Sequence, residues 1–356
     1  MYKVSGRQVM LMGVVLTLIS CLISVSSLVV GTSKTDFWLS YIWALLLPLL
    51  SMWFLHLLIQ QHSGKDVFEI LAIRWPLAGK GIILLILLYY WVILCRDIRR
   101  LVDLTDIILL PDTPLTVINI LVVFTTVVLS MSGLEVLARV TEVFLPILLV
   151  TLLLVPVGMF RELDWASLQP ILADGLVPSL KGAWLILPYF GEIAALAFVV
   201  SGDVFRFQQG MYGLLMGAGF KMFMTTLIVL SLGVELAGSM VYPVFEMIRQ
   251  VQLTDFLDRF DLPLVGLFYP CYLVKLGINL YLVAHGIKVI TPNVAEKDIV
   301  PPLGVLAVVC SFWFFHNMVD LYEMNRTFPF IALVFQILLP VMLFFLLRKR
   351  NRQPGT

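Results

Sequence analysis

The sequence has 356 residues, of which 60% are hydrophobic and 13% are charged. A soluble globular domain has about 45–50% apolar and about 25% charged residues, so this composition excludes a soluble enzyme and a disordered chain. The 24 Lys and Arg residues nearly balance the 23 Asp and Glu residues, and the net charge of +1 offers no bulk attraction for nucleic acid. The composition therefore predicts an all-α integral membrane protein.

The spacing of cysteine and histidine gives no sign of a redox or metal centre. No pair of cysteines has a CxxC spacing, and the four histidines have no ligand-like spacing. The four cysteines lie in or beside apolar runs: Cys21, Cys95, Cys271 and Cys310. We therefore expect no disulfide framework, no metal site and no bound cofactor.

Long uncharged runs divide the chain into membrane spans. A bilayer core of about 30 Å requires about 20 apolar residues in a helix, and the runs at 9–33 and 37–61 already meet that length. Merging runs that are split by a single charge predicts ten transmembrane helices with short loops, in one domain of residues 1–356. Basic residues precede the first helix and follow the last. An even number of spans puts both termini on one side, which is predicted to be cytoplasmic.

Helix-breaking residues inside an apolar run identify a candidate binding region. Backbone polar groups in lipid must be satisfied internally, so irregular backbone is tolerated only inside protein or beside a wet cavity. In the sixth predicted span, Pro188, Gly191 and Glu192 fall within five residues. Two interpretations are open, a proline kink packed against neighbouring helices or a discontinuous helix whose free ends face a ligand. The position of Glu192 at the break favours the second interpretation.

The first span contains a weaker signal of the same kind. Its serines at 20, 24, 26 and 27 can bond to the preceding turn and loosen the helix, but close packing of small residues between helices explains them equally well. Breaks in helices one and six are the expectation for an inverted five-plus-five repeat. The two repeats would comprise about residues 8–160 and 178–348, with a substrate site at the midplane between the breaks.

Two ionisable residues, Glu192 and Lys275, interrupt otherwise apolar spans. Each costs roughly 2.5–3.5 kcal/mol at a helix centre, which indicates pairing, a water-filled cavity or a shifted proton equilibrium. Three arrangements are open: a static ion pair between helices six and eight, two groups that flank a polar ligand, or two groups that do not meet. Helical spacing places Tyr272 and Asn279 on the same face as Lys275.

Other polar residues of the spans are interpreted as peripheral. Lys221 lies nearer a helix end and is expected to snorkel or to face a loop. The alternating charges of residues 96–106 include the i,i+4 pair Arg99 and Asp103, and we expect them to extend the third helix beyond the membrane core. Tyr89 precedes that stretch and is either part of an interfacial aromatic belt or a flat wall of the site.

Several segments together resemble the B subunit of the GerA-type spore germinant receptors, a branch of the amino acid–polyamine–organocation transporter superfamily. The segments are Asp36-Phe37-Trp38-Leu39-Ser40, Asp112-Thr113-Pro114, Gly133-Leu134-Glu135-Val136-Leu137-Ala138-Arg139, Pro188-Tyr189-Phe190-Gly191-Glu192, Tyr242-Pro243 with Phe245-Glu246, Asp255-Phe256-Leu257-Asp258-Arg259, and Val274-Lys275. Their order and spacing carry the resemblance, which runs from about residue 4 to residue 350.

The resemblance implies a LeuT-like fold of ten helices, with helices one and six discontinuous. It also implies an assembly with an A subunit and a C lipoprotein in the inner membrane of a bacterial spore, and ligands that are small nutrients, often amino acids. Similar proteins have a Gly-rich turn in helix one followed by Leu-Pro, where this sequence reads Leu18-Ile19-Ser20-Cys21 and Ser24-Val25. Carried over by position, the ligand-binding residues are Leu18, Ser20, Cys21, Tyr89, Tyr189, Phe190, Gly191, Glu192, Lys275 and Asn279.

We therefore expect a germinant-sensing subunit that binds a nutrient such as an amino acid at the membrane midplane and signals to partner subunits. The ligand carboxylate would meet free N–H groups at a broken helix with help from Lys275, and its ammonium would meet Glu192. The rival hypotheses are a proton-coupled amino-acid transporter, in which Glu192 or Lys275 titrates, and a pore subunit for ions. An enzyme is not expected, since the sequence has no HExxH or GxSxG-like motif.

Overall fold

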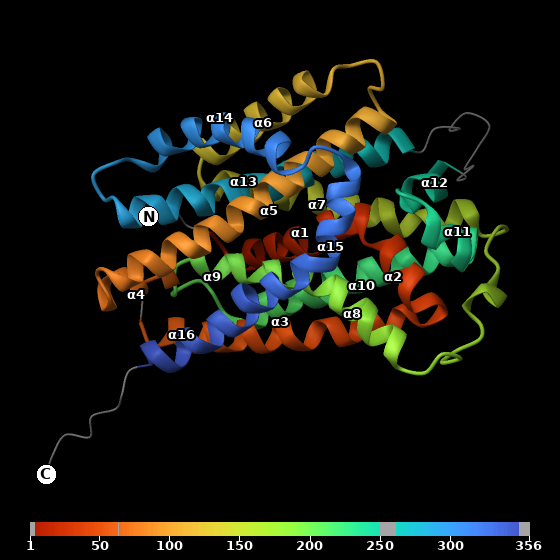
Figure 1. Ribbon diagram of the computed structural model, residues 1–356, viewed down its shortest axis with the longest axis horizontal. Helices are drawn as coiled ribbons and strands as arrows, with labels where there is room; N and C mark the ends of the chain where they lie inside the picture. Colours follow the sequence, from red (N-terminus) through yellow and green to blue (C-terminus); the bar gives the residue numbers. More distant parts are fainter. Residues whose placement is uncertain (1–3, 63, 250–260, 349–356) are drawn as a thin grey trace, which may run out of the picture.

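The computed structural model is a bundle of helices (Figure 1), and it describes residues 4–62, 64–249 and 261–348. Among these residues, nine helical segments are long and apolar enough to cross a membrane, and α6 (Leu115–Met131) is an apolar helix of 17 residues. In chain order these segments follow the ten spans that the uncharged runs predict. The chain is therefore an all-α integral membrane protein with a helix count near ten.

The first half of the chain forms spans one to five. The segments are α1 (Gly6–Ser24), α2 (Ser26–Ser33), the 3-10 turn η1 (Lys34–Asp36), α3 (Phe37–Gln60), the short α4 (Val67–Arg74), α5 (Ala78–Ile108), α6 and α7 (Leu134–Met159). The first span comprises α1 and α2, the second is α3, and α4 is a short helix between the second and third spans.

The second half forms spans six to ten. The segments are η2 (Trp165–Leu168), α8 (Val177–Phe190), η3 (Gly191–Ala195), α9 (Leu196–Val199), α10 (Phe207–Leu232), α11 (Val234–Ser239), α12 (Pro243–Arg249), α13 (Asp261–Ile290), α14 (Glu296–Phe314), α15 (Met318–Ala332), the π-helical η4 (Leu333–Leu338) and α16 (Leu339–Leu347). Residues 255–259, which contribute to the resemblance, lie outside the described residues, as do the basic residues beyond Arg348.

Side-chain caps determine where several helices begin. The hydroxyl of Ser5 accepts a hydrogen bond from the backbone N–H of Gln8 at 3.3 Å, and the Gln8 side chain accepts one from the N–H of Ser5 at 2.9 Å. This capping box satisfies two N–H groups that the start of α1 leaves free. Asp66 caps α4 in a similar way by accepting from the N–H of Glu69 at 3.0 Å.

The first and sixth spans lie at the centre of the bundle. Of their apolar stretches, 78% and 89% are buried, compared with 33% for the fifth span. The first span contacts α10, α7 and α13, while α8 packs along α3 and against α2 (Figure 1). A pair of helices enclosed on all sides is where a backbone irregularity can be satisfied by protein rather than exposed to lipid.

Close contact between α1 and α10 depends on glycine. A Cβ atom on Gly213 would lie 2.7 Å from the carbonyl oxygen of Met10 and 3.2 Å from Cα of Gly13. Small residues let the two backbones approach in this way, which is a common mode of helix association in membranes. The contact holds the first span against α10 along its length.

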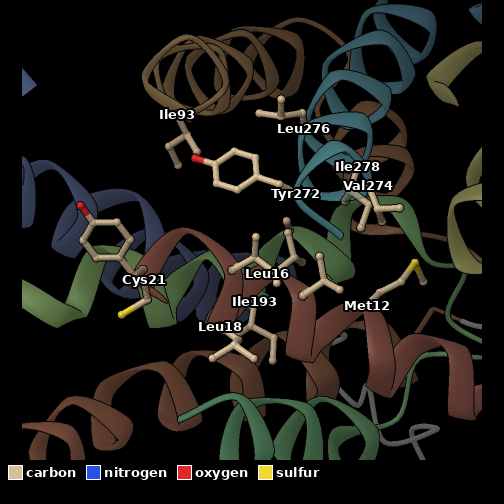
Figure 2. Packing of buried hydrophobic residues seen from close by; sticks show 14 of the residues in the cluster. Met12, Leu16, Leu18, Cys21, Ile93, Ile193, Tyr272, Val274, Leu276 and Ile278 are labelled. Carbon is tan, nitrogen blue, oxygen red and sulfur yellow. The ribbon is translucent and has the colours of Figure 1, made fainter. Parts of the chain in front are cut away.

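Apolar side chains fill the space around the middle of α1. Figure 2 shows Leu16 of α1, Ile193 of η3 and Leu276 of α13 gathered around Tyr272, with Ile93 of α5 above it. All five side chains are buried. This core fixes the positions of α1, α5, η3 and α13 relative to one another.

Both predicted helix breaks are present. In the first span α1 ends at Ser24 and α2 begins at Ser26, with Val25 between them at φ −104° and ψ −21°. In the sixth span the α-helix changes to a 3-10 helix at Gly191–Ala195 before α9 resumes. The first break therefore lies at Ser24-Val25, where similar proteins have Leu-Pro, and residues 18–21 lie in the regular part of α1.

Candidate functional site

Five ionisable side chains meet at the centre of the bundle, and we call them the central charged cluster: Arg96, Asp97, Arg100, Glu192 and Lys275. Each is 4% exposed or less. Nζ of Lys275 lies 2.7 Å from Oε2 of Glu192 and 3.0 Å from Oδ2 of Asp97. Nη2 of Arg96 lies 2.6 Å from Oε1 of Glu192 and 2.8 Å from Oδ1 of Asp97. Each carboxylate is therefore shared between Lys275 of α13 and at least one arginine of α5.

Four segments bring the central charged cluster together. The helix α5 supplies Arg96, Asp97 and Arg100, η3 supplies Glu192, and α13 supplies Lys275. The hydroxyl of Ser20 in α1 donates to Oδ2 of Asp97 at 3.0 Å and accepts a short hydrogen bond from Lys275. The cluster is therefore placed by the same four segments that enclose the apolar core around α1.

The central charged cluster carries more positive than negative charge. Three cations face two carboxylates, so one positive charge is in excess when all five groups are ionised. Arg100 holds the weakest pairing, since its Nη1 lies 3.9 Å from Oδ1 of Asp97. Uncompensated charge is expensive in a buried site, so an anionic group near Arg100 would be stabilised.

Aromatic rings form one wall of the site. The guanidinium of Arg96 lies over the rings of Tyr189 and Phe328, at 4.9 Å and 5.2 Å from their centroids. Tyr89 stacks on Phe328 on one side, with centroids 5.7 Å apart, and on Phe335 with centroids 4.8 Å apart. Cations held over aromatic faces are stabilised by the ring quadrupole. This wall links the cluster to α15 and η4 of the tenth span.

Asn325 in α15 connects two sides of the site. Its Oδ1 accepts hydrogen bonds from Nη2 of Arg100 at 2.8 Å and from the hydroxyl of Tyr189 at 2.6 Å. A single amide oxygen thus joins the third, sixth and tenth spans beside the central charged cluster.

Gln336 stabilises the break of the sixth span. Its Nε2 donates to the carbonyl oxygen of Pro188 at 2.8 Å, and its own backbone carbonyl accepts a short hydrogen bond from Ser51. Because a Cβ on Gly191 would lie 2.6 Å from Cδ of Gln336, only glycine leaves room for this side chain. The π-helical turn of the tenth span and the 3-10 turn of the sixth therefore fit together through one glutamine.

Several buried polar atoms near the central charged cluster have no hydrogen-bond partner among the described residues. They are Nη1 of Arg96, Nη1 of Arg100, the hydroxyl of Tyr89, both amide atoms of Asn279, Oε1 of Gln336, and Oε2 of Glu192, which lies within ion-pair distance of Lys275. Buried polar groups are normally hydrogen-bonded to protein or to water, so unsatisfied groups in one region indicate a missing polar partner. The set contains both donors and acceptors, which favours a partner that carries both kinds of group.

Comparisons with known proteins establish the family. The family model described as spore germination protein matches residues 3–319 of the chain. The chain belongs to the spore germination protein family. Three Bacillus proteins named for spore germination are similar to this germination protein. YfkT of Bacillus subtilis (strain 168) is 30% identical over 350 residues, which is 98% of each chain.

The other two relatives are more distant. Spore germination protein KB of the same organism is 26% identical over 285 residues, which cover 76% of this germination protein and 75% of the relative. Spore germination protein XB of Bacillus anthracis is 22% identical over 223 residues, which cover 60% and 62% of the two chains. Together with the family model, these matches confirm the resemblance drawn from the sequence.

The solved structure of Mhp1, a nucleobase-cation-symport-1 family transporter in a closed conformation with bromovinylhydantoin bound, has the same fold. It superposes with a TM-score of 0.68 over 99% of this germination protein and 80% of the transporter, at 14% sequence identity. This match confirms the LeuT-like architecture of the germination protein, and at this identity it shows the fold alone.

The structure brings together most of the residues that the sequence assigned to a binding site. Glu192 and Lys275 form an ion pair, and Ser20 bonds to their cluster. Tyr189 contacts both arginines of the cluster through its ring. Tyr89 reaches the cluster through the aromatic wall and is 4% exposed, so it does not belong to an interfacial belt.

The remaining assigned residues are arranged differently. Asn279 is fully buried on α13, one turn from Lys275, and Gly191 adjoins the cluster at the sixth break. Phe190 packs against Tyr41, with ring centroids 6.2 Å apart. Leu18 and Cys21 lie in the regular part of α1 and are buried in the apolar core.

The long third helix and its Arg99–Asp103 pair, at 2.9 Å, are confirmed, but the placement of these charges beyond the core is wrong. Arg96, Asp97 and Arg100 lie at the centre of the bundle because α5 is one unbroken helix of 31 residues and its uncharged part ends near the middle. Arg96 and Arg100 are four residues apart, so they lie on one face of the helix. This spacing is the feature of the sequence that could have predicted a shared buried position.

The interpretation of Lys221 as a snorkelling residue is also wrong. Lys221 is fully buried in α10, where its Nζ donates to the carbonyl oxygen of Leu22 at 3.4 Å and to the hydroxyl of Ser26. These two acceptors flank the break between α1 and α2, so the ammonium satisfies groups that the break leaves free. Lys221 therefore stabilises the first break from the side.

Proposed function

We propose that this germination protein is the germinant-sensing subunit of a spore nutrient receptor, and that the central charged cluster binds the germinant. The observation that carries this proposal is the group of unsatisfied polar atoms beside buried, ionised side chains. Buried charges in a membrane bundle are expensive and mark functional positions. The two helix breaks that flank the site resemble the arrangement in which discontinuous helices bind a ligand at the midplane.

An amino acid fits this site by exchanging partners with the existing ion pairs. Its carboxylate would accept from Arg100 and Arg96, whose Nη1 atoms lack partners in the described part of the chain and which carry the excess charge of the cluster. Its ammonium would bind Glu192 in place of Lys275. Tyr89 and Asn279 would provide further hydrogen bonds. A zwitterion keeps the total charge of the site unchanged while it satisfies the unpaired donors.

Binding becomes a signal only if the ligand prefers one of two conformations. Replacing the bond between Glu192 and Lys275 would release η3 from α13, and Gln336 would pass this change from the sixth span to the tenth. We propose that the A subunit and the C lipoprotein respond to this rearrangement, with the assembly in the spore inner membrane and both termini of this chain in the cytoplasm.

A thermal-shift screen of amino acids on the purified full-length protein tests the site. A ligand that binds only the folded state stabilises it by mass action, by about 2.7 kcal/mol when the free ligand concentration is 100 times Kd. This gain raises the melting temperature. We expect Glu192→Gln and Arg100→Gln to abolish the shift, while Thr125→Val, on an exposed face of α6, retains it. Shifts that persist in both site variants, at normal protein levels, would place the ligand elsewhere.

Transport is tested separately with liposomes that contain the purified protein alone. Concentrative uptake of the amino acid found in the screen would identify a transporter. Binding without uptake supports a sensing subunit, and the dose of the same amino acid that triggers germination should rise in spores that carry Arg100→Gln. Ion leak without accumulation would instead indicate a pore subunit.

A further inference from the structure

A lateral groove with two unpaired cations lies on the outside of the sixth and tenth spans. Its volume is about 540 Å³, and its lining includes Lys181 and Trp184 of α8, Leu28 of α2, and Asn325 and Arg326 of α15. Lys181 and Arg326 are exposed, and neither has an ion-pair partner among the described residues. The groove therefore presents two free positive charges next to an apolar floor.

The surface around the groove is apolar and accessible. Val177 and Leu180 of α8 are 59% and 52% exposed, and Phe330 of α15 is 63% exposed. The ring of Trp184 packs edge-on against Phe330, with centroids 5.0 Å apart. Exposed apolar residues on a membrane span face the acyl chains. The cations are thus set within the part of the surface that lipid covers.

We propose that the groove binds an anionic phospholipid, with the headgroup phosphate between Lys181 and Arg326 and an acyl chain along Val177, Leu180 and Trp184. Charge complementarity selects a lipid with a net negative charge, because basic pockets between transmembrane helices attract anionic headgroups. A zwitterionic lipid offers the same phosphate beside its own ammonium, which competes with the two cations. This site is separate from the central charged cluster and does not require that the cluster bind a germinant.

The position of the groove connects a bound lipid with the interior. Asn325 contributes to the lining, and its Oδ1 accepts from Arg100 at 2.8 Å and from Tyr189 at 2.6 Å. A headgroup in the groove would therefore lie against the residue that joins the third, sixth and tenth spans. Lipid composition would then influence the packing of α15 on α8.

The test measures lipid binding to the full-length protein in a non-ionic detergent, by native mass spectrometry with added phosphatidylglycerol or phosphatidylcholine. We expect phosphatidylglycerol to bind more tightly, and we expect Lys181→Gln and Arg326→Gln each to weaken its binding about fivefold. Lys181→Arg should retain wild-type binding. The double variant Arg161→Gln/Lys297→Gln also removes two exposed cations, elsewhere in the chain, and should change the affinity less than twofold.

Four results would overturn the proposal. Equal affinity for the two lipids would show that net charge is not recognised. A loss in the Arg161→Gln/Lys297→Gln control as large as in the groove variants would show that only total charge matters. Glycerol phosphate that binds as tightly as phosphatidylglycerol would identify a soluble anion as the ligand. Unchanged lipid affinity in the Lys181→Gln variant, together with loss of co-purification with another subunit, would assign the groove to a protein partner.

Discussion

Nζ of Lys275 lies 2.7 Å from Oε2 of Glu192, so the two ionised groups that interrupt the eighth and sixth spans bind each other at the centre of the bundle. Removing one member of a buried pair leaves the other charge uncompensated, which costs about 3–5 kcal/mol. We expect Glu192→Gln to lower the free energy of unfolding by this amount, and Lys275→Met to lower it by less, because Glu192 stays paired with Arg96. The double variant keeps the net charge of the cluster and should lose less than the sum of the two singles, with a coupling of about 0.5–3 kcal/mol.

Denaturant or thermal unfolding of the purified variants in one detergent measures this coupling. The control cycle uses Lys297→Met and Glu162→Gln, two exposed residues with no ion pair to each other among the described residues, whose effects should add. Additive effects in the Glu192 and Lys275 cycle would show that the two charges do not depend on each other.

The spans were predictable from the sequence because a membrane helix is a local property. Each needs about 20 apolar residues, and a charge-free run reports this directly. The break of the sixth span was predictable for the same reason, since Pro188 and Gly191 act on their own turn. The fold and half of the site thus depend on information that lies within single segments.

The rest of the site depends on how separate helices pack, which no single segment reveals. In the sequence alone, Arg96 and Asp97 look like the polar end of a membrane helix. Only the structure shows that α5 continues past them to Ile108. Gln336 and Asn325 are uncharged and do not interrupt an apolar run, so a search for charge misses them. Only the assembled bundle shows that both contact the sixth span.

Asn279 offers a way to separate ligand binding from stability. Both of its amide atoms are buried without a partner among the residues that the structure describes, so replacing it with the similarly sized Leu removes two unsatisfied groups. We expect Asn279→Leu to leave the melting temperature of the ligand-free protein unchanged or higher, because an unsatisfied buried group costs about 1–3 kcal/mol. The same variant should lose the shift that an amino-acid ligand produces.

The matched control is Asn119→Leu. The Asn119 side chain donates to Ser311 at 2.9 Å and to the carbonyl oxygen of Val308 at 3.3 Å, between α6 and α14. Losing these bonds should destabilise the protein by about 1–3 kcal/mol without affecting the ligand shift. If Asn279→Leu is as destabilising as Asn119→Leu, Asn279 has a structural role and not a binding role.

Gly191 and Gln336 should depend on each other. A Cβ on Gly191 would lie 2.6 Å from Cδ and 3.1 Å from Cβ of Gln336, and overpacking of this kind costs about 1–3 kcal/mol. We expect Gly191→Ala to be destabilising and the additional change Gln336→Ala to recover part of the loss. Gly219→Ala is the control, because open space surrounds that position in α10 and alanine favours helix by about 1 kcal/mol. A Gly191→Ala protein with normal stability would contradict the fit between the two turns.

Lys221 and Ser26 should be coupled in the same way at the first break. The Lys221 ammonium contacts no carboxylate among the described residues and donates to the Ser26 hydroxyl and the carbonyl oxygen of Leu22. A hydrogen bond to a charged group contributes about 1.5–3 kcal/mol, so Ser26→Ala should lower the free energy of unfolding by that amount. In a Lys221→Met background the same change should cost less than about 0.5 kcal/mol, because the charge that needed the hydroxyl is gone. Unfolding of the four proteins measures the difference, with Ser132→Ala at the exposed C-cap of α6 as the control. An equal cost of Ser26→Ala in both backgrounds would mean that Lys221 does not stabilise the break.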